Sequence, residues 1–137
     1  MLKVSKILDQ ELLDWFQGSK VCLRPGKPMT LFRGITVTPE DRHASAILGI
    51  FLTPNKETAT SYAGEGGTTH QYYVKICKPF LMSAMDLCEI TTPEARALRR
   101  KLEGKGYDGI FVTPLGEPYP GDISEYIAFK PNQLRPV

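Results

Sequence analysis

Short apolar segments separated by glycine- and proline-rich turns are the feature that most constrains the fold of this chain. The 137 residues include 12 glycines and 11 prolines, many of which stand between strand-like runs. The runs do not alternate regularly with helices, as they would in a parallel βαβ chain. The pattern predicts an α+β fold in a single domain covering residues 1–137.

Three helices are predicted from the spacing of apolar residues and from their boundary signals. Each predicted helix is short, and none shows a heptad repeat. The predicted helices are residues 5–17, with Gly18 after the last turn; a short helix through 57–62, opened by Thr53 and Pro54; and 91–104, opened by a Thr-Thr-Pro-Glu sequence.

Five strands are predicted from alternating or uniformly apolar runs that end at turn residues. The polar segment 35–45 and the Gly/Pro-rich segment 114–121 are predicted to be loops. The predicted strands are 29–32, which ends at Arg33-Gly34, and 47–52, 71–76, 109–113 and 123–129.

Charge and cysteine usage limit the classes of partner. Seventeen Lys and Arg against 15 Asp and Glu give a net charge of +2, too small for bulk attraction to nucleic acid or anionic membranes. Three cysteines without a C-x-x-C pair and two isolated histidines predict neither a disulfide framework nor a metal site. No signal peptide or membrane-spanning run is expected, so the sequence favours a protein of the cytoplasm that makes no membrane contact.

Three segments place chemically reactive side chains beside predicted strands. Taken singly, each has an ordinary explanation, since a strand-end arginine can be a surface charge, aromatic rings can be core residues and a strand glutamate can face solvent. Taken together and in order, they match the signature motifs of a known family. The segments are 31–34, then 49–53 with 59–62, and 124–129.

The sequence resembles the ADP-ribosyltransferase superfamily, whose NAD-dependent fold is shared by diphtheria toxin and the poly(ADP-ribose) polymerases. Residues 32–34 (Phe-Arg-Gly) hold the place of the first motif, which ends in His-Gly in the polymerases. Residues 49–52 (Gly-Ile-Phe-Leu), with Ser-Tyr at 61–62, are similar to the second motif. Residues 125–129 (Glu-Tyr-Ile-Ala-Phe) reproduce the third almost letter for letter. The resemblance implies a split β-sandwich of two mostly antiparallel sheets with short flanking helices.

The N-terminal third resembles a group found in phage and mobile-element polyvalent proteins. Residues 15–21 and 26–28 fit its Trp-Phe-Gly-x-Ser-Lys-Val segment and Gly-Lys-Pro turn, and residues 107–110 fit its Tyr-Asp-Gly-Ile. The resemblance thus covers about residues 12–137. It implies a toxin or effector of the cytoplasm, which would be the host-cell cytoplasm for a phage-encoded protein.

The resemblance implies an NAD-dependent mono-ADP-ribosyltransferase, which cleaves the nicotinamide–ribose bond and transfers ADP-ribose to an acceptor. Glu125 would be the catalytic residue, because a carboxylate stabilises the oxocarbenium-like centre that forms as nicotinamide leaves. Arg33 would bind the diphosphate or the adenosine ribose, and the Gly34 backbone the carboxamide. The implied NAD-binding residues are Arg33, Gly34, Phe51, Thr53 and Tyr62, with Phe51 and Tyr62 stacking on the nicotinamide ring.

Departures from the family pattern define the alternatives. Arg33 replaces the polymerase His and matches the toxin-like Arg-Ser-Glu branch, while Phe51 and Ala59 replace a Tyr and a Ser. These changes favour, as a second hypothesis, a module of the same fold that binds NAD or a partner protein without transfer. Ile123 stands where arginine-modifying toxins have Glu or Gln, which disfavours arginine as the acceptor.

The acceptor is left open between a protein side chain (of a host protein, for example), a nucleic acid, a small molecule and water. A third hypothesis, a nucleic-acid-binding protein, rests on the basic residues of segment 96–105.

Overall fold

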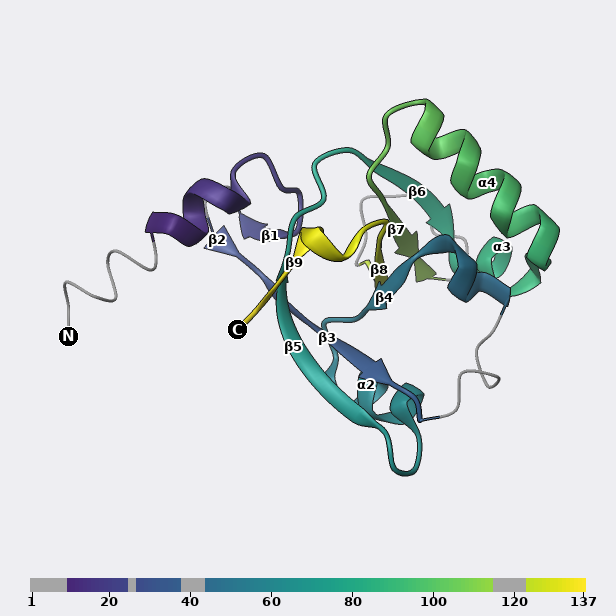
Figure 1. Cartoon of the computed structure of the whole chain (residues 1–137), viewed down its shortest axis with the longest axis horizontal. Coiled ribbons are helices and arrows are strands. Elements are labelled where there is room, and N and C mark those ends of the chain that lie inside the picture. The colour runs from purple at the N-terminus through teal and green to yellow at the C-terminus, as the bar shows by residue number, and fades with distance from the viewer. Residues whose placement is uncertain (1–9, 25–26, 38–43, 115–122) are drawn as a thin grey trace.

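The computed structural model describes residues 10–24, 27–37, 44–114 and 123–137, and it shows an α+β fold (Figure 1). Strands form a three-stranded sheet, a four-stranded sheet and a short two-stranded pair. In chain order the elements are a helix over residues 10–16, β1 (Cys22–Arg24), β2 (Lys27–Pro28), β3 (Thr30–Ile35), η2 (Ala44–Leu48), β4 (Ile50–Leu52), α2 (Lys56–Ala63), β5 (Thr68–Val74), β6 (Pro79–Ser83), α3 (Ala84–Glu89), α4 (Thr92–Gly104), β7 (Gly109–Thr113), β8 (Glu125–Ala128), η4 (Pro131–Gln133) and β9 (Leu134–Pro136).

The two larger sheets differ in strand direction. The three-stranded sheet has the order β3-β5-β9 and is antiparallel throughout. The four-stranded sheet has the order β4-β8-β7-β6, and β6 pairs with β7 in parallel while the other two pairs are antiparallel. Helices α3 and α4 supply the crossover between β6 and β7, because parallel neighbours require a long connection.

Two hydrophobic clusters hold these layers together. One cluster joins the sheets, with Leu31 and Val74 from the three-stranded sheet packed against Leu52, Phe111 and Tyr126 from the four-stranded sheet. The other lies between the four-stranded sheet and the α3–α4 segment, which lie side by side in Figure 1. The four-stranded sheet is therefore covered on both faces, which explains why β7 is buried along its whole length.

The two sheets are also joined by main-chain hydrogen bonds. The Phe32 N–H donates to the Thr53 carbonyl at 2.7 Å, and the Thr53 N–H donates to the Phe32 carbonyl at 2.9 Å. Thr53 directly follows β4, so this bridge fixes one edge of β3 against the end of β4.

Helix α4 agrees closely with its predicted boundaries. Thr91 caps the helix by accepting from the Glu94 N–H, and Glu94 Oε1 accepts from the Thr91 N–H in return. This capping box, with Pro93 in the first turn, satisfies main-chain donors that the first turn of a helix leaves without partners. The prediction of α4 is confirmed from its cap to Gly104.

The start of α2 differs from its prediction. The capping residue is Asn55, whose side-chain oxygen accepts from the Thr58 N–H at 3.0 Å. Thr53 does not cap the helix, because its main chain is held in the bridge to Phe32 and its Oγ1 accepts from the Asn55 N–H at 3.2 Å. The prediction of Thr53 and Pro54 as the opening pair was wrong by two residues.

Other boundaries also shift. Strand β3 continues through Arg33 and Gly34 to Ile35 where the prediction ends it, because β5 pairs with it along that whole length. Only the end of the predicted 47–52 strand is extended, since residues 44–48 form a 3-10 helix. Strand β6 and helix α3 were not predicted at all.

Some predictions concern residues whose structure is not described. Of the predicted helix 5–17, residues 10–16 are helical, and its first turn lies outside the described residues. The predicted loops 35–45 and 114–121 likewise fall mostly outside the described ranges. Among the helices of the described part, none is both long and apolar enough to cross a membrane.

Candidate functional site

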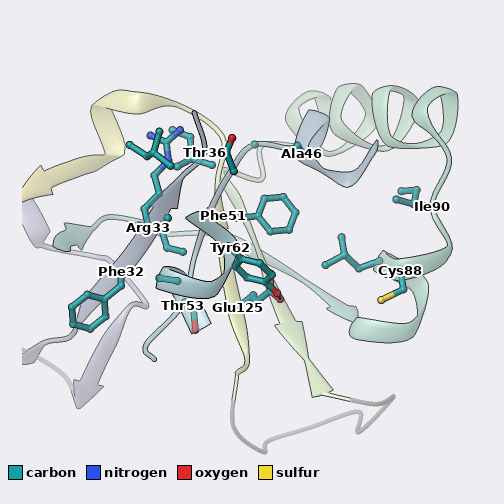
Figure 2. A pocket seen from close by; sticks show the side chains of 17 residues that line it. Phe32, Arg33, Thr36, Ala46, Phe51, Thr53, Tyr62, Cys88, Ile90 and Glu125 are labelled. Atoms are coloured by element: carbon teal, nitrogen blue, oxygen red, sulfur yellow. The ribbon is translucent and has the colours of Figure 1, made fainter. Parts of the chain in front are cut away.

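A cavity of about 530 Å³ opens beside the bridge between the two sheets. Segments from β3, β4, α2, α3 with the residue after it, and the start of β8 line it, so residues far apart in the sequence meet there (Figure 2). All of the site residues named from the sequence lie on its wall: Arg33, Gly34, Phe51, Thr53, Tyr62 and Glu125.

Glu125 and Tyr62 form the polar centre of this cavity. The Tyr62 hydroxyl donates a 2.9 Å hydrogen bond to Glu125 Oε1. Glu125 is the first residue of β8 and Tyr62 lies in the last turn of α2, so the bond links elements that are far apart in the sequence. Figure 2 shows the Tyr62 ring and the Glu125 side chain side by side, with the Phe51 ring close to them.

Burial alters the titration of both groups. Desolvation of the carboxylate raises the pKa of Glu125, although the hydrogen bond from Tyr62 opposes the increase. Burial, followed by the hydrogen bond and the negative charge of Glu125, raises the pKa of Tyr62 to about 12. Tyr62 therefore stays protonated and keeps donating to Glu125 across the physiological pH range.

The register of β4 and β8 explains why Phe51 and Glu125 share the cavity. Phe51 lies opposite Ile127, and Glu125 is on the same face of β8 as Ile127 because side chains alternate along a strand. Phe51 and Glu125 thus point to the same side of the four-stranded sheet. Within the described ranges, neither the Phe51 nor the Tyr62 ring is in contact with another aromatic ring. Both rings line the cavity, so a flat ligand ring bound there can contact them.

Arg33 lies at another side of the cavity, next to Thr36 in Figure 2. It is half-buried in β3 and faces the same way as Leu31, toward the other sheet. No carboxylate of the described residues forms an ion pair with Arg33. The single ion pair among the described residues joins Arg99 and Glu103. A guanidinium on a cavity wall with no acidic partner among the described residues is suited to an anionic ligand.

Gly34 also has a packing role that the sequence analysis did not predict. A Cβ on Gly34 would lie 2.0 Å from the Ala59 carbonyl oxygen and 2.8 Å from the Ala63 nitrogen. The missing side chain therefore lets α2 pack directly on β3. Close packing of α2 in turn places Tyr62 over the cavity.

The main chain of Gly34 points toward the cavity rather than toward β5. In an antiparallel pair, successive residues alternate between bonding the partner strand and facing away from it. Phe32 bonds Thr53 with both main-chain groups, so Phe32 and, two residues on, Gly34 face away from β5. The N–H and C=O of Gly34 are therefore directed to the edge on which the cavity opens.

The cavity also contains residues that the sequence analysis did not select. Leu87, Cys88 and Ile90 form its wall on the side of α3. Cys88 and Ile90 lie opposite Arg33 in Figure 2. The sequence contained one signal for α3, because Ser83 is a residue type that often caps helices. In the structure Ser83 caps α3 by accepting from the Asp86 N–H. The short length of this helix, Ala84–Glu89, hid it from the periodicity analysis.

One arginine of the basic helix that supported the nucleic-acid hypothesis stabilises the fold. Arg99 donates to the Leu48 carbonyl at 3.0 Å and to the Phe129 carbonyl at 2.6 Å, and it pairs with Glu103 at 2.9 Å. Arg99 thus binds its own protein, which leaves Arg96 and Arg100 as exposed arginines of α4.

Comparisons with known proteins return no match. The sequence fits no family model, and searches of curated proteins and of solved structures find nothing similar.

Proposed function

We propose that this protein is an NAD-dependent mono-ADP-ribosyltransferase with the split β-sandwich of that superfamily, and that its site is the cavity around Glu125. The observation that carries the proposal is the convergence of all three sequence motifs on one cavity, with Tyr62 bonded to Glu125 at 2.9 Å. The motifs were selected from the sequence by their resemblance to the family's motifs, and their convergence on one cavity supports that selection.

The proposed reaction breaks the bond between the nicotinamide nitrogen and the ribose anomeric carbon. The electron pair leaves with nicotinamide, the acceptor donates a lone pair to the anomeric carbon, and the acceptor proton is released. Positive charge develops on the ribose as the bond breaks. A half-buried carboxylate such as Glu125 stabilises that charge more in the transition state than in the ground state.

Other residues supply binding. The main-chain N–H and C=O of Gly34 provide the donor and the acceptor that a carboxamide requires. Phe51 and Tyr62 offer aromatic faces to the cationic nicotinamide ring, each worth about 0.5–2 kcal/mol. Arg33 binds the diphosphate or the adenosine ribose. Thr53 lines the cavity but contributes chiefly to its frame, since its side chain and main chain are engaged by Asn55 and Phe32.

Ile123 supports an acceptor other than arginine. Its side chain packs against the cluster between the two sheets, and it is not a polar group that could engage a guanidinium.

The alternative is a module of the same fold that binds NAD without transferring ADP-ribose. Ala59 favours it, because this residue is fully buried under β3 and has no side-chain hydroxyl to bond the carboxamide. Burial, which raises the pKa of Glu125, also favours this alternative because a protonated carboxyl cannot stabilise the oxocarbenium charge, whereas the hydrogen bond from Tyr62 opposes the increase.

Calorimetric titration with NAD, followed by transfer of a labelled ADP-ribose from NAD to host extract, separates the two functions. Binding with transfer or with release of nicotinamide supports the enzyme, and binding alone supports the module. Absence of binding overturns both. In both assays Glu125→Gln is compared with the control Glu65→Gln, which removes an exposed carboxylate outside the cavity.

A further inference from the structure

A second cavity, of about 400 Å³, lies at the opposite end of β8 from Glu125. Phe129 and Lys130, which follow β8, are part of its wall, and Trp15, Lys75 and Tyr107 are others. None of these residues belongs to the Glu125 cavity, so the two sites are separate in both residues and position.

Positive charge collects around this second cavity. Lys75 and Lys130 line it, the Lys78 ammonium lies 4.8 Å from the centre of the Tyr107 ring, and the Arg135 guanidinium lies 4.8 Å from the centre of the Trp15 ring. The described part of the chain contains no ion pair that involves any of these four cations. The Lys78 ammonium also donates to the Lys105 carbonyl at 2.9 Å, but an uncharged acceptor does not neutralise it, so the charge of all four cations can attract an anionic ligand.

The two acidic residues on the wall are already engaged. Glu103 pairs with Arg99 at 2.9 Å. The Asp108 carboxylate accepts from the Cys77 N–H at 2.9 Å and from the Lys78 N–H at 2.8 Å. Asp108 keeps its negative charge, but the four cations outnumber it, so the cavity and its rim carry a surplus of positive charge although the chain as a whole is close to neutral.

Gln133 holds the two lining lysines in a fixed relation. Its side-chain nitrogen donates to the Lys75 carbonyl at 2.9 Å and to the Asp108 carbonyl at 2.8 Å, and its oxygen accepts from the Lys130 N–H at 2.8 Å. One side chain thus joins the main-chain segments that carry Lys75 and Lys130, so the fold keeps both lysines at this cavity.

We propose that this cavity and its cationic rim bind single-stranded nucleic acid. Cations from several segments can contact successive phosphates, and the rings of Trp15 and Tyr107 lie among them. Phosphate contacts interleaved with aromatic rings are how proteins bind single strands without reading sequence. An acidic peptide would use the cations but not the rings. The proposal does not rest on the NAD chemistry of the other cavity.

The position of Trp15 provides a direct readout. It is the single tryptophan of the chain and it lines this cavity, so its fluorescence reports on ligands bound there. A fluorescein-labelled oligothymidine is titrated with the full chain, and its anisotropy and the Trp15 emission are recorded over a series of salt concentrations. We expect both signals to change at the same protein-to-strand ratio, with affinity falling as salt increases.

Charge reversal tests the rim. In the variant that combines Lys75→Glu with Lys130→Glu, we expect affinity for the strand to fall about tenfold or more, since a contact to a charged group is worth roughly that factor. The salt slope should decrease by about 0.7 for each lysine that contacts a phosphate. Combined Lys75→Ala and Lys130→Ala substitutions give a smaller loss in the same direction and cover the case in which the Glu variant does not fold.

The matched control is Arg96→Glu with Arg100→Glu, which makes the same charge change on the exposed face of α4. Retention of affinity in this control supports the proposal, and an equal loss overturns it in favour of α4 or of bulk charge. Strand binding that leaves Trp15 emission unchanged also overturns it. So does equal competition by inorganic phosphate or by polyglutamate, which would show a simple anion site or an unspecific polyanion surface.

Discussion

At the scale of single residues, burial and the hydrogen bond from Tyr62 act in opposite directions on the protonation of Glu125, the candidate catalytic group. Burial disfavours the carboxylate and Tyr62 favours it, with burial the larger effect. A carboxyl whose pKa is higher in the folded state lowers stability as the pH rises through that pKa, because the unfolded chain then holds the proton less tightly. Glu125 therefore costs the fold stability at neutral pH, which is typical of a group kept for function.

Replacement of Glu125 by Gln tests this assignment. The amide keeps the shape and can still accept from Tyr62, but it lacks the charge that opposes the oxocarbenium centre. We expect turnover of NAD to fall about 100- to 1,000-fold, with NAD binding retained. The melting temperature should stay the same or rise at neutral pH, since a costly buried charge is removed. Near wild-type rates would contradict the catalytic role.

The variant Tyr62→Phe keeps the aromatic ring and removes the donor. The pKa of Glu125 should then rise further, because the interaction that lowers it is lost. Activity requires the ionised carboxylate, so the acid limb of the kcat/KM profile is expected to move to higher pH. The control Tyr73→Phe, outside the cavity, should leave the profile in place. An unshifted acid limb in Tyr62→Phe would separate this bond from catalysis.

The substitution Arg33→Ala tests whether Arg33 contributes to NAD binding and not to the chemical step. Its proposed contact is with a part of NAD remote from the bond that breaks, and such a contact is equal in the ground and transition states. We expect KM for NAD to rise with little change in kcat. Arg96→Ala, on α4, is the matched control. A large decrease in kcat at unchanged KM would instead place Arg33 beside the reacting atoms.

The residues of the candidate site were predictable from the sequence to the extent that they belong to local motifs. Glu125, with the strand residues after it, and Phe51 are such cases. The bond between Tyr62 and Glu125 was not predictable, since it joins residues 63 positions apart and depends on how α2 lies on β3. Cys88 was missed for a similar reason, because it reaches the cavity only through the crossover that contains α3.

At the scale of secondary-structure elements, the contact between α2 and β3 sets the geometry of the cavity. Gly34→Ala should destabilise the fold by about 1–3 kcal/mol, because the added methyl group would meet the Ala59 carbonyl at 2.0 Å. Urea denaturation measures the change. Gly104→Ala is the control, since a Cβ there meets nothing within 4 Å and the substitution should be neutral or slightly stabilising. Equal effects of the two substitutions would contradict the packing argument.

Prediction of the elements succeeded where the signal was local. The capping box at Thr91 and the uniformly apolar run of β7 gave α4 and β7 with their observed bounds. Prediction failed where pairing across the fold decides the structure. Strand β3 extends to Ile35 because β5 lies beside it, and β6 becomes a strand through its parallel pairing with β7.

At the scale of the whole molecule, β8 separates the two cavities. Glu125 begins the strand and Lys130 follows its end, so the two ligands proposed above would bind without contact. Each should stabilise the protein by about 2.7 kcal/mol at a hundredfold excess over its Kd. We expect the two effects on the free energy of unfolding to add within about 0.5 kcal/mol, as measured by denaturation with either ligand and with both. A larger deviation would show that the sites are coupled.

The close contact between Gly34 and α2 also bears on how such a site can diversify. A side chain at position 34 would collide with main-chain atoms of α2, which cannot rotate out of the way as side chains do. A side chain at position 34 is therefore incompatible with this packing, and a chain that keeps the packing needs glycine there. Changes in ligand preference would instead involve the side chains that line the cavity, at positions such as Phe51, Cys88 and Ile90.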